Sequence, residues 1–227
     1  MSEVKKTKVH LISGFLGTGK TTALKSLMEQ KDPNEKWVII VNEFGEIGID
    51  GAVLSDNGIP VAEIAGGCLC CTAGPQMGVT VQKMLRDAKP DRLMIEASGL
   101  AHAASVIDEL KAKPLDSLLE IGAVFTVVDP RQFINPDYAQ QALYKDQIGI
   151  CDVLVASKTD LCTPEQLAEF HDKAAKLFPP KAKVVEVQNA QLDIQWLDIP
   201  VIEKSRYRLL KLNKLFNNHL LHIATCA

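Results

Sequence analysis

A glycine-rich run near the N-terminus carries the clearest chemistry in this sequence of 227 residues. Residues 14–22 read Gly-Phe-Leu-Gly-Thr-Gly-Lys-Thr-Thr and lie between an apolar run and a segment with helical spacing. Glycines in such a loop let backbone N–H groups curl around an anion, and the start of the following helix adds partial positive charge. The pattern predicts a phosphate-binding loop that comprises Gly14, Gly17, Thr18, Gly19, Lys20, Thr21 and Thr22.

Four residues are candidates for catalysis of phosphate transfer or hydrolysis. The Lys20 ammonium should reach the β- and γ-phosphate oxygens of a nucleotide, and the Thr21 hydroxyl should hold Mg²⁺. Farther along, Glu-Ala-Ser-Gly ends an apolar run at residues 96–99. Glu96 should emerge near Mg²⁺ and the Gly99 amide should approach the γ-phosphate. The plainer interpretation of Glu96 is a surface carboxylate at the end of a strand.

The run Ser-Lys-Thr-Asp at residues 157–160 resembles the Asn-Lys-x-Asp motif with which GTPases recognise guanine. Asp160 would accept hydrogen bonds from two guanine nitrogens that adenine cannot match, and the Lys158 stem would lie along the base. Ser157 replaces the usual Asn, which should cost one hydrogen bond, about 1 kcal/mol, and weaken the guanine preference without removing it. Residues 188–190 are either a loop that closes over the base or a plain loop.

Three of the six cysteines lie within four residues, at Cys68, Cys70 and Cys71, a spacing too tight for an ordinary disulfide framework. Thiolates with this spacing can converge on one ion, and soft sulfur selects Zn²⁺ or Cu⁺ over Mg²⁺. Three buried thiols or a catalytic thiol are the alternatives. The remaining cysteines are expected to pack as small apolar residues.

Segments typical of strands and of helices alternate along the chain, and these segments would place the candidate residues. Short β-rich runs occur at 9–13, 37–42, 92–97, 123–129, 153–157 and 184–187, and helical spacing occurs at 21–29, 76–88, 102–110, 139–148 and 164–177. Alternation of this kind predicts an α/β fold, a three-layer P-loop NTPase domain with a mostly parallel sheet and helices on both faces. Residues 1–200 are expected to form this domain, with ligands bound beyond the carboxyl ends of the strands.

Composition narrows the function further. Apolar residues make up 47% and charged residues 23% of the chain, and the net charge of −3 argues against nucleic-acid binding. No apolar run approaches the roughly 20 residues that cross a bilayer, so we expect a cytoplasmic protein without a membrane partner. Residues 201–227 carry five Lys or Arg against a single acid, which predicts a basic tail, expected as a helix around residues 209–221 that docks on the acidic body. A helix that binds a partner or a membrane surface is the alternative.

Taken together, the phosphate loop, Asn-Glu-Phe-Gly-Glu at 42–46, Gly-Gly-Cys-Leu-Cys-Cys at 66–71 and Glu-Ala-Ser-Gly at 96–99 resemble the CobW-type P-loop GTPases, relatives of the nickel-site GTPases UreG and HypB. The resemblance runs from about residue 9 to about residue 160. It implies a zinc metallochaperone or zinc-homeostasis GTPase that binds GTP, Mg²⁺ and Zn²⁺, with Glu46 as a companion ligand to the three clustered cysteines. Some relatives carry a Glu where this chain has Val41, so their ligand set does not transfer whole. His102 is a further candidate ligand, although a structural or nucleotide-side role suits it better.

Members of the family usually carry a second, C-terminal α/β domain, and this chain ends where that domain should begin. We therefore expect a shortened form or a truncated product. The client metalloprotein is not identified by the sequence, and a homodimer is left open. The sequence offers no evident arginine finger, which predicts slow basal hydrolysis.

The expected mechanism is a coupling in which GTP holds the metal site closed and hydrolysis releases the ion. Three other interpretations compete with it. A small-molecule kinase of the same fold would prefer adenine and leaves the cysteines unexplained. A zinc-responsive binding protein with vestigial GTPase activity would turn over GTP at a rate that metal does not change. A purely structural zinc would make chelation unfold the chain.

Overall fold

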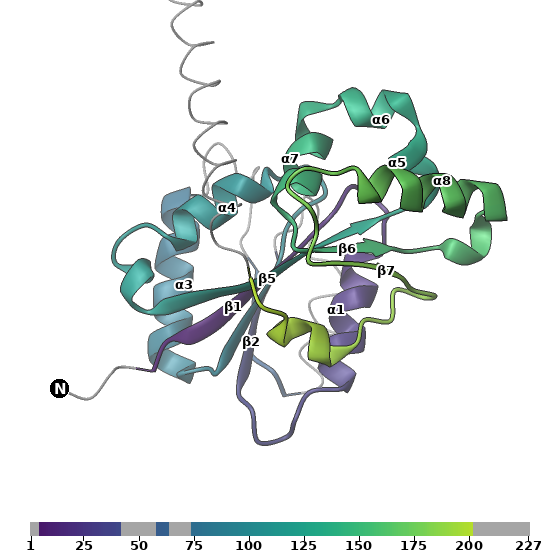
Figure 1. The fold of residues 1–227 in the computed structure, drawn as a ribbon. Coiled ribbons are helices and arrows are strands. Elements are labelled where there is room, and N and C mark those ends of the chain that lie inside the picture. The colour runs from purple at the N-terminus through teal and green to yellow at the C-terminus, as the bar shows by residue number, and fades with distance from the viewer. Residues whose placement is uncertain (1–4, 42–57, 64–73, 202–227) are drawn as a thin grey trace, which may run out of the picture.

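The computed structural model describes residues 5–41, 58–63 and 74–201 (Figure 1). Within these residues, seven strands form one sheet in the order β3-β2-β4-β1-β5-β6-β7, and each neighbouring pair is parallel. The predicted parallel α/β architecture is therefore confirmed. The strands are β1 (Thr7–Ser13), β2 (Trp37–Val41), β3 (Val61–Glu63), β4 (Arg92–Glu96), β5 (Leu119–Val128), β6 (Val153–Ala156) and β7 (Lys183–Glu186).

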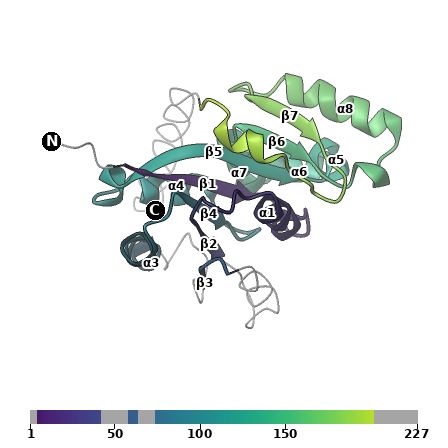
Figure 2. The same cartoon turned by 90° about the horizontal axis from the view of Figure 1, so that it is seen from below.

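Helices pack on both faces of the sheet (Figures 1 and 2). Helix α1 covers one face together with the short 3₁₀ helix η3, while α3, α4 and α7 cover the other. The α-helices are α1 (Lys20–Glu29), α3 (Gly74–Ala88), α4 (Ala103–Leu110), α5 (Pro130–Ile134), α6 (Pro136–Gln140), α7 (Ala142–Ile150) and α8 (Pro164–Ala175), and the 3₁₀ helices are η1 (Leu115–Ser117), η2 (Thr159–Leu161) and η3 (Ile194–Asp198).

Alternation along the central strand β5 explains the two-sided core. Val124 and Val128 belong to the apolar cluster on the α3 and α4 side, whereas Phe125 and Val127 belong to the cluster on the α1 side. Successive side chains of a strand point to opposite faces, so a sheet covered on both faces needs apolar residues at every position. The buried run from Ala123 to Val128 meets that requirement except at Thr126, whose hydroxyl donates to the Gln147 carbonyl oxygen at 2.8 Å.

Several elements differ from their prediction. The helix expected at 139–148 is two helices, α6 and α7, because the backbone of Gln141 between them is extended (φ −68°, ψ 126°). Strand β3 and helix α5 were not predicted, and β5 begins at Leu119, before the expected 123. The basic tail at 202–227 lies outside the described residues. In the described part of the chain, no helix is long and apolar enough to span a membrane.

Candidate nucleotide site

The phosphate loop connects β1 to α1 at the carboxyl edge of the sheet. Gly14, Gly17 and Gly19 adopt positive φ angles of 142°, 70° and 98°. A Cβ on Gly14 would lie 2.2 Å from the Val127 carbonyl oxygen, so the close approach of β5 excludes any side chain there. Gly19 immediately precedes α1 in the left-handed conformation. The loop therefore leads directly into the N-terminus of a ten-residue helix, where backbone N–H groups attract an anion.

Two side chains of the loop bind its own backbone. The Lys20 ammonium donates a hydrogen bond to the Phe15 carbonyl oxygen at 3.0 Å, and the Thr18 hydroxyl donates to the same oxygen at 2.9 Å. Lys20 and Thr18 are both buried, whereas Thr22 is exposed at the first turn of α1. A cation is thus held within the loop that would receive the phosphates.

The candidate magnesium ligands Thr21 and Glu96 are in contact. The Thr21 hydroxyl donates a hydrogen bond to Glu96 Oε1 at 2.8 Å. The two residues meet because β1 and β4 are parallel neighbours in which Ile12 pairs with Glu96, so the end of β4 lies beside the start of the loop. A hydroxyl and a carboxylate are oxygen donors of the kind that Mg²⁺ takes in nucleotide sites. The donor set fits that ion.

Gly99 packs against the phosphate loop. A Cβ at this position would lie 2.7 Å from Leu16 Cδ2 and 2.8 Å from the Leu16 backbone nitrogen, so a side chain would displace the loop. Gln147 of α7 holds this segment in place, because its side-chain amide donates to the carbonyl oxygens of Gly99 and Ala101, each at 3.2 Å. The predicted γ-phosphate sensor is therefore in contact with both the phosphate loop and α7.

Ser157 ties the end of β6 to the phosphate loop. Its buried hydroxyl lies 2.7 Å from the Thr18 carbonyl oxygen and 3.1 Å from the Val128 carbonyl oxygen. One hydroxyl proton serves one acceptor at a time, and the shorter contact is to Thr18. Serine thus makes at this position a link that the sequence interpretation did not foresee.

Lys158 and Asp160 follow on the same edge. Lys158 has a left-handed backbone (φ 55°), and its ammonium lies 4.0 Å from Asp129 Oδ2. Asp160 is exposed in η2, with its carboxylate open to a ligand. The loop at 188–190 also reaches this region, because a Cβ on Gly19 would lie 3.4 Å from Ala190 Cβ. Asn189 and Ala190 both have positive φ angles, of 50° and 52°.

Asp129 is a site residue that the sequence reasoning missed. It follows β5, is buried, and accepts hydrogen bonds from the Arg131 backbone N–H at 3.0 Å and from the Arg131 guanidinium at 2.9 and 2.6 Å. Burial opposes ionisation, but the hydrogen bonds from Arg131 hold the pKa of Asp129 below its ordinary value. A buried anion thus faces Lys158. The run Asp-Pro after an apolar strand is an N-cap signature that would have revealed it.

The predicted zinc ligands Cys68, Cys70, Cys71 and Glu46 lie outside the described residues. Strand β3 ends at Glu63, at the same edge of the parallel sheet as the ends of β1 and β4. Among residues 5–41, 58–63 and 74–201, no three His, Cys, Asp or Glu side chains form a metal-binding group.

Of the other candidates, His102 is the N-cap residue of α4, and its Nδ1 lies 3.8 Å from Asp146 Oδ2. This contact suits the structural role that the sequence favoured. Cys151 is buried and Cys162 is half-buried, and neither forms a disulfide within the described residues. The Cys151 thiol lies 3.3 Å from the Ile148 carbonyl oxygen.

Comparison with known sequences gives consistent matches. A family model described as "CobW/HypB/UreG, nucleotide-binding domain" matches residues 8–186. Zinc chaperone YeiR of Escherichia coli is 46% identical over 159 residues, which cover 70% of this chain and 48% of that protein. Zinc chaperone CobW of Pseudomonas aeruginosa is 30% identical over 225 residues, which cover 86% of this chain and 60% of that protein. The chain thus spans about half to three fifths of the length of these relatives.

Solved structures share the fold. The Zn(II)-bound YjiA GTPase from Escherichia coli superposes with a TM-score of 0.61 at 23% identity, covering 86% of this chain and 62% of that one. HypB from Helicobacter pylori in complex with nickel gives a TM-score of 0.57 at 18% identity, covering 91% of this chain and 87% of that one. Because the family model covers well over half of the sequence, the chain belongs to the CobW/HypB/UreG family.

Proposed function

We propose that this chain is a GTP-hydrolysing, zinc-binding protein that couples the hydrolysis of GTP to the transfer of zinc to a client metalloprotein. The observation that carries the proposal is the contact between the Thr21 hydroxyl and the Glu96 carboxylate beside the phosphate loop. That contact joins the two elements that a Mg²⁺-dependent nucleotide hydrolase requires, a phosphate loop and a carboxylate at the end of a neighbouring parallel strand.

Each residue of the site has a distinct role in the proposed hydrolysis. Backbone N–H groups of residues 14–19 and of the first turn of α1 cradle the phosphates, and Lys20 neutralises charge on the β- and γ-phosphates. Thr21 and Glu96 would hold Mg²⁺, which offsets the negative charge that develops on the phosphate oxygens. The Gly99 backbone N–H would orient the γ-phosphate and its attacking water. We expect basal turnover to be slow and to depend on Mg²⁺.

Guanine selection is assigned to Asp160 and Lys158. The exposed Asp160 carboxylate would accept two hydrogen bonds from the base, and the Lys158 stem would support the ring. Asp129 positions Lys158 by lying 4.0 Å from its ammonium. Ser157 helps to hold this region against the phosphate loop through its bond to the Thr18 carbonyl oxygen.

Zinc is the proposed cargo, with Cys68, Cys70, Cys71 and Glu46 as its ligands. Support comes from the Cys-x-Cys-Cys spacing in the sequence and from relatives that are named zinc chaperones. The proposed zinc ligands must remain reduced thiols, and we place the activity in the cytoplasm, where such thiols persist.

The test measures the zinc dissociation constant by competition with a chromophoric chelator, first with a non-hydrolysable GTP analogue and then with GDP. We expect the two constants to differ about 5- to 150-fold, the usual range for coupled sites. Steady-state GTP hydrolysis is measured in parallel with and without equimolar Zn²⁺. The Cys70→Ser variant should lose zinc binding and keep GTP binding, whereas the matched control Cys162→Ser should keep both.

Equal zinc constants in the two nucleotide states would contradict the transfer mechanism. If metal also left the turnover unchanged, a zinc-responsive binding protein with vestigial hydrolysis would replace the proposal. Unfolding of the chain on chelation would instead indicate a structural zinc.

A further inference from the structure

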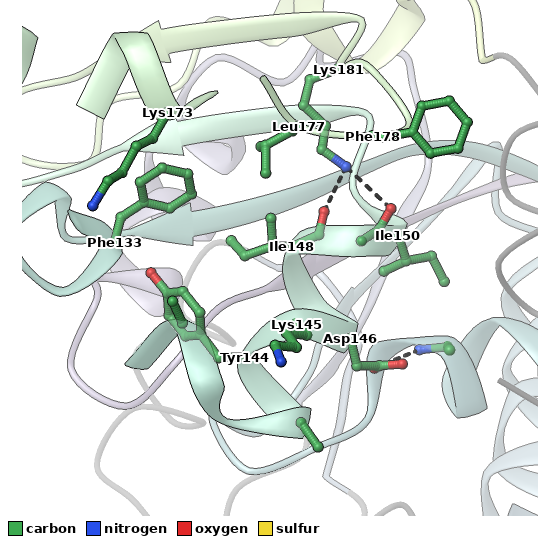
Figure 3. Close-up of a pocket in the computed structure, with 14 residues that line it drawn as sticks. Phe133, Tyr144, Lys145, Asp146, Ile148, Ile150, Lys173, Leu177, Phe178 and Lys181 are labelled. Atoms are coloured by element: carbon green, nitrogen blue, oxygen red, sulfur yellow. Dashed lines mark hydrogen bonds between the residues drawn. The ribbon is translucent and has the colours of Figure 1, made fainter. Parts of the chain in front are cut away.

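A cavity of about 550 Å³ lies between α5, α7 and α8, apart from the residues of the nucleotide site (Figure 3). Its walls are mainly apolar and include Phe133, Ile148, Ile150 and Leu177. Phe178 also lines it, although 80% of this residue is exposed to solvent. The volume falls within the range of small-molecule sites, which are concave, mostly apolar and equipped with a few polar groups.

Tyr144 lines the cavity, and its hydroxyl is buried within the cavity wall. The residue is only 3% exposed, and its hydroxyl has no hydrogen-bond partner in the part of the chain that the structure describes. In Figure 3 the hydroxyl points toward Phe133, on the side of the cavity where Lys173 also lies. Burial raises the pKa of Tyr144, which keeps the hydroxyl protonated and able to donate. Buried hydroxyls in folded proteins are almost always paired, so this one calls for an acceptor.

Charges around the cavity favour an anion. Its lining residues include the lysines Lys145, Lys173 and Lys181, against one carboxylate, Asp146. Asp146 Oδ2 accepts a hydrogen bond from the Ala104 N–H at 3.2 Å, and the Lys173 ammonium is paired with Glu169 Oε1 at 2.8 Å. The Lys181 ammonium donates to the carbonyl oxygen of Ile148 at 2.6 Å and fixes the end of α7. With Glu169 counted, three lysines stand against two carboxylates, and the remaining excess of positive charge complements a carboxylate head group.

Helix α7 connects the cavity wall to the nucleotide site. The Tyr144 ring packs edge-on against the ring of Phe15 in the phosphate loop, with 6.1 Å between ring centroids. One turn further along, Gln147 donates to the Gly99 and Ala101 carbonyl oxygens. A shift of α7 would therefore move both the phosphate loop and the segment at Gly99 that would sense the γ-phosphate.

We propose that this cavity is a binding site for a small amphipathic carboxylate, with the apolar body between α7 and α8 and the head group bonded to the Tyr144 hydroxyl. We further infer that its occupancy alters nucleotide affinity through α7, a part of the proposal that rests on the function proposed above. Ligand and nucleotide must then influence each other's binding reciprocally.

The experiment uses decanoate as the probe and decanol and decylamine as neutral and cationic counterparts of the same length. Isothermal titration of the full chain should give saturable decanoate binding, at least tenfold tighter than that of either counterpart. The variant Tyr144→Phe should bind decanoate about tenfold more weakly, because it lacks the donor to a charged acceptor. Its melting temperature should be unchanged or raised, since the hydroxyl makes no bond in the described residues. If the Tyr144 hydroxyl had a merely structural role, the Tyr144→Phe variant would have a lower melting temperature than the wild type.

Ala139 lines the cavity from an exposed position on α6, so Ala139→Trp should block the cavity without disturbing the core. Val79→Trp, at an exposed position of α3, is the matched control and should bind decanoate like the wild type. Absence of saturable binding to the wild type, or equal affinity in the Ala139→Trp and Val79→Trp variants, would overturn the site. Equal affinity for decanoate and decylamine would overturn the assignment to an anion.

The coupling is tested by titrating decanoate in the presence of GDP and then of a non-hydrolysable GTP analogue. We expect the dissociation constants to differ at least fivefold. Equal constants would overturn the coupling alone. A separate titration of nucleotide into the ligand-free chain distinguishes this result from failure of the proposed function, which would appear as no binding of guanine nucleotide at all.

Discussion

The two edges of the parallel sheet differ in what their interactions connect. At the carboxyl edge, functional side chains bind backbone oxygens of the phosphate loop: Lys20 binds Phe15, and Ser157 binds Thr18. At the amino edge, an ion network joins elements distant in sequence, because the Arg92 guanidinium donates to Glu35 at 2.7 Å and to Asp198 at 3.0 Å. One edge thus orders loops that would meet a ligand, and the other links β4 to the rest of the fold.

The number of left-handed residues also differs between the two edges. Of the four left-handed residues with side chains in the described part of the chain, Lys158, Asn189 and Ala190 lie at the carboxyl edge, and Lys89 alone precedes β4 at the amino edge. Each costs roughly 1–2 kcal/mol relative to a right-handed conformation. Such strain is found where a site must hold a fixed shape, and the remainder of the fold must offset it. Substitutions at the carboxyl edge should therefore change nucleotide chemistry with little loss of stability, whereas those at the amino edge should do the reverse.

The largest effect is expected for Lys20→Ala. Because the ammonium would act mainly on the charge that develops during hydrolysis, turnover of GTP should fall by about 100-fold or more. The melting temperature should change little, since the hydrogen bond to Phe15 lies within a single loop. Lys25→Ala on the same helix is the matched control for the loss of one positive charge. Turnover like that of the wild type in Lys20→Ala would refute the phosphate-loop assignment.

A smaller effect is expected for Asp160→Asn. The variant loses the carboxylate that would accept both guanine donors, so GTP affinity should fall about 30-fold, equivalent to about 2 kcal/mol, and xanthine nucleotides should be favoured instead. Competition binding with GTP, ATP and XTP measures the change. Asp172→Asn, also at an exposed position, controls for the lost charge. An unchanged preference for GTP would mean that the base is recognised elsewhere.

His10 supplies the corresponding test at the amino edge. It is fully buried beside Arg92, and burial followed by the nearby guanidinium lowers its pKa from 6.5 to about 3. Below pH 6.5 the unfolded chain binds a proton at His10 that the folded chain does not, so the free energy of unfolding should fall as the pH falls. Between pH 6.5 and 5.0 the loss should be about 1.6 kcal/mol from this group.

Urea denaturation at several pH values measures this loss. In the His10→Gln variant, which does not titrate, the same interval should show a correspondingly smaller loss. An identical pH dependence in variant and wild type would show that His10 is not the group responsible.

Much of the carboxyl edge was predictable because its chemistry is local in sequence. The phosphate loop needs glycines at fixed positions, and the pairing of Ile12 with Glu96 follows once β1 and β4 are known to be parallel neighbours. The alternation of strands and helices supplied that parallel arrangement. Thr21 and Glu96 could therefore be assigned to one site before their 2.8 Å contact was known.

What could not be predicted depends on contacts between distant segments. Strand β3 has only three residues, too few for a periodic signal, and its pairing with β2 stabilises it. The break at Gln141 has no glycine or proline to announce it within the expected helix. The cavity beside Tyr144 depends on how α5, α7 and α8 pack, which no local pattern encodes.

The smallest effect is expected for substitution of Ser157, which combines features of both edges. Its hydroxyl is buried at the carboxyl edge yet links two elements, β6 and the phosphate loop, as the ion network does at the amino edge. Ser157→Ala should remove one hydrogen bond and lower the free energy of unfolding by about 1 kcal/mol, with a loss of GTP affinity of up to tenfold because the loop is less well fixed. Ser105→Ala, outside the site, is the matched control. Ser157→Asn introduces the residue usual in GTPases and should retain GTP binding if the larger amide can reach the same carbonyl oxygens. Loss of GTP affinity in Ser157→Ala without any loss of stability would show that the hydroxyl serves the nucleotide and not the link between β6 and the loop.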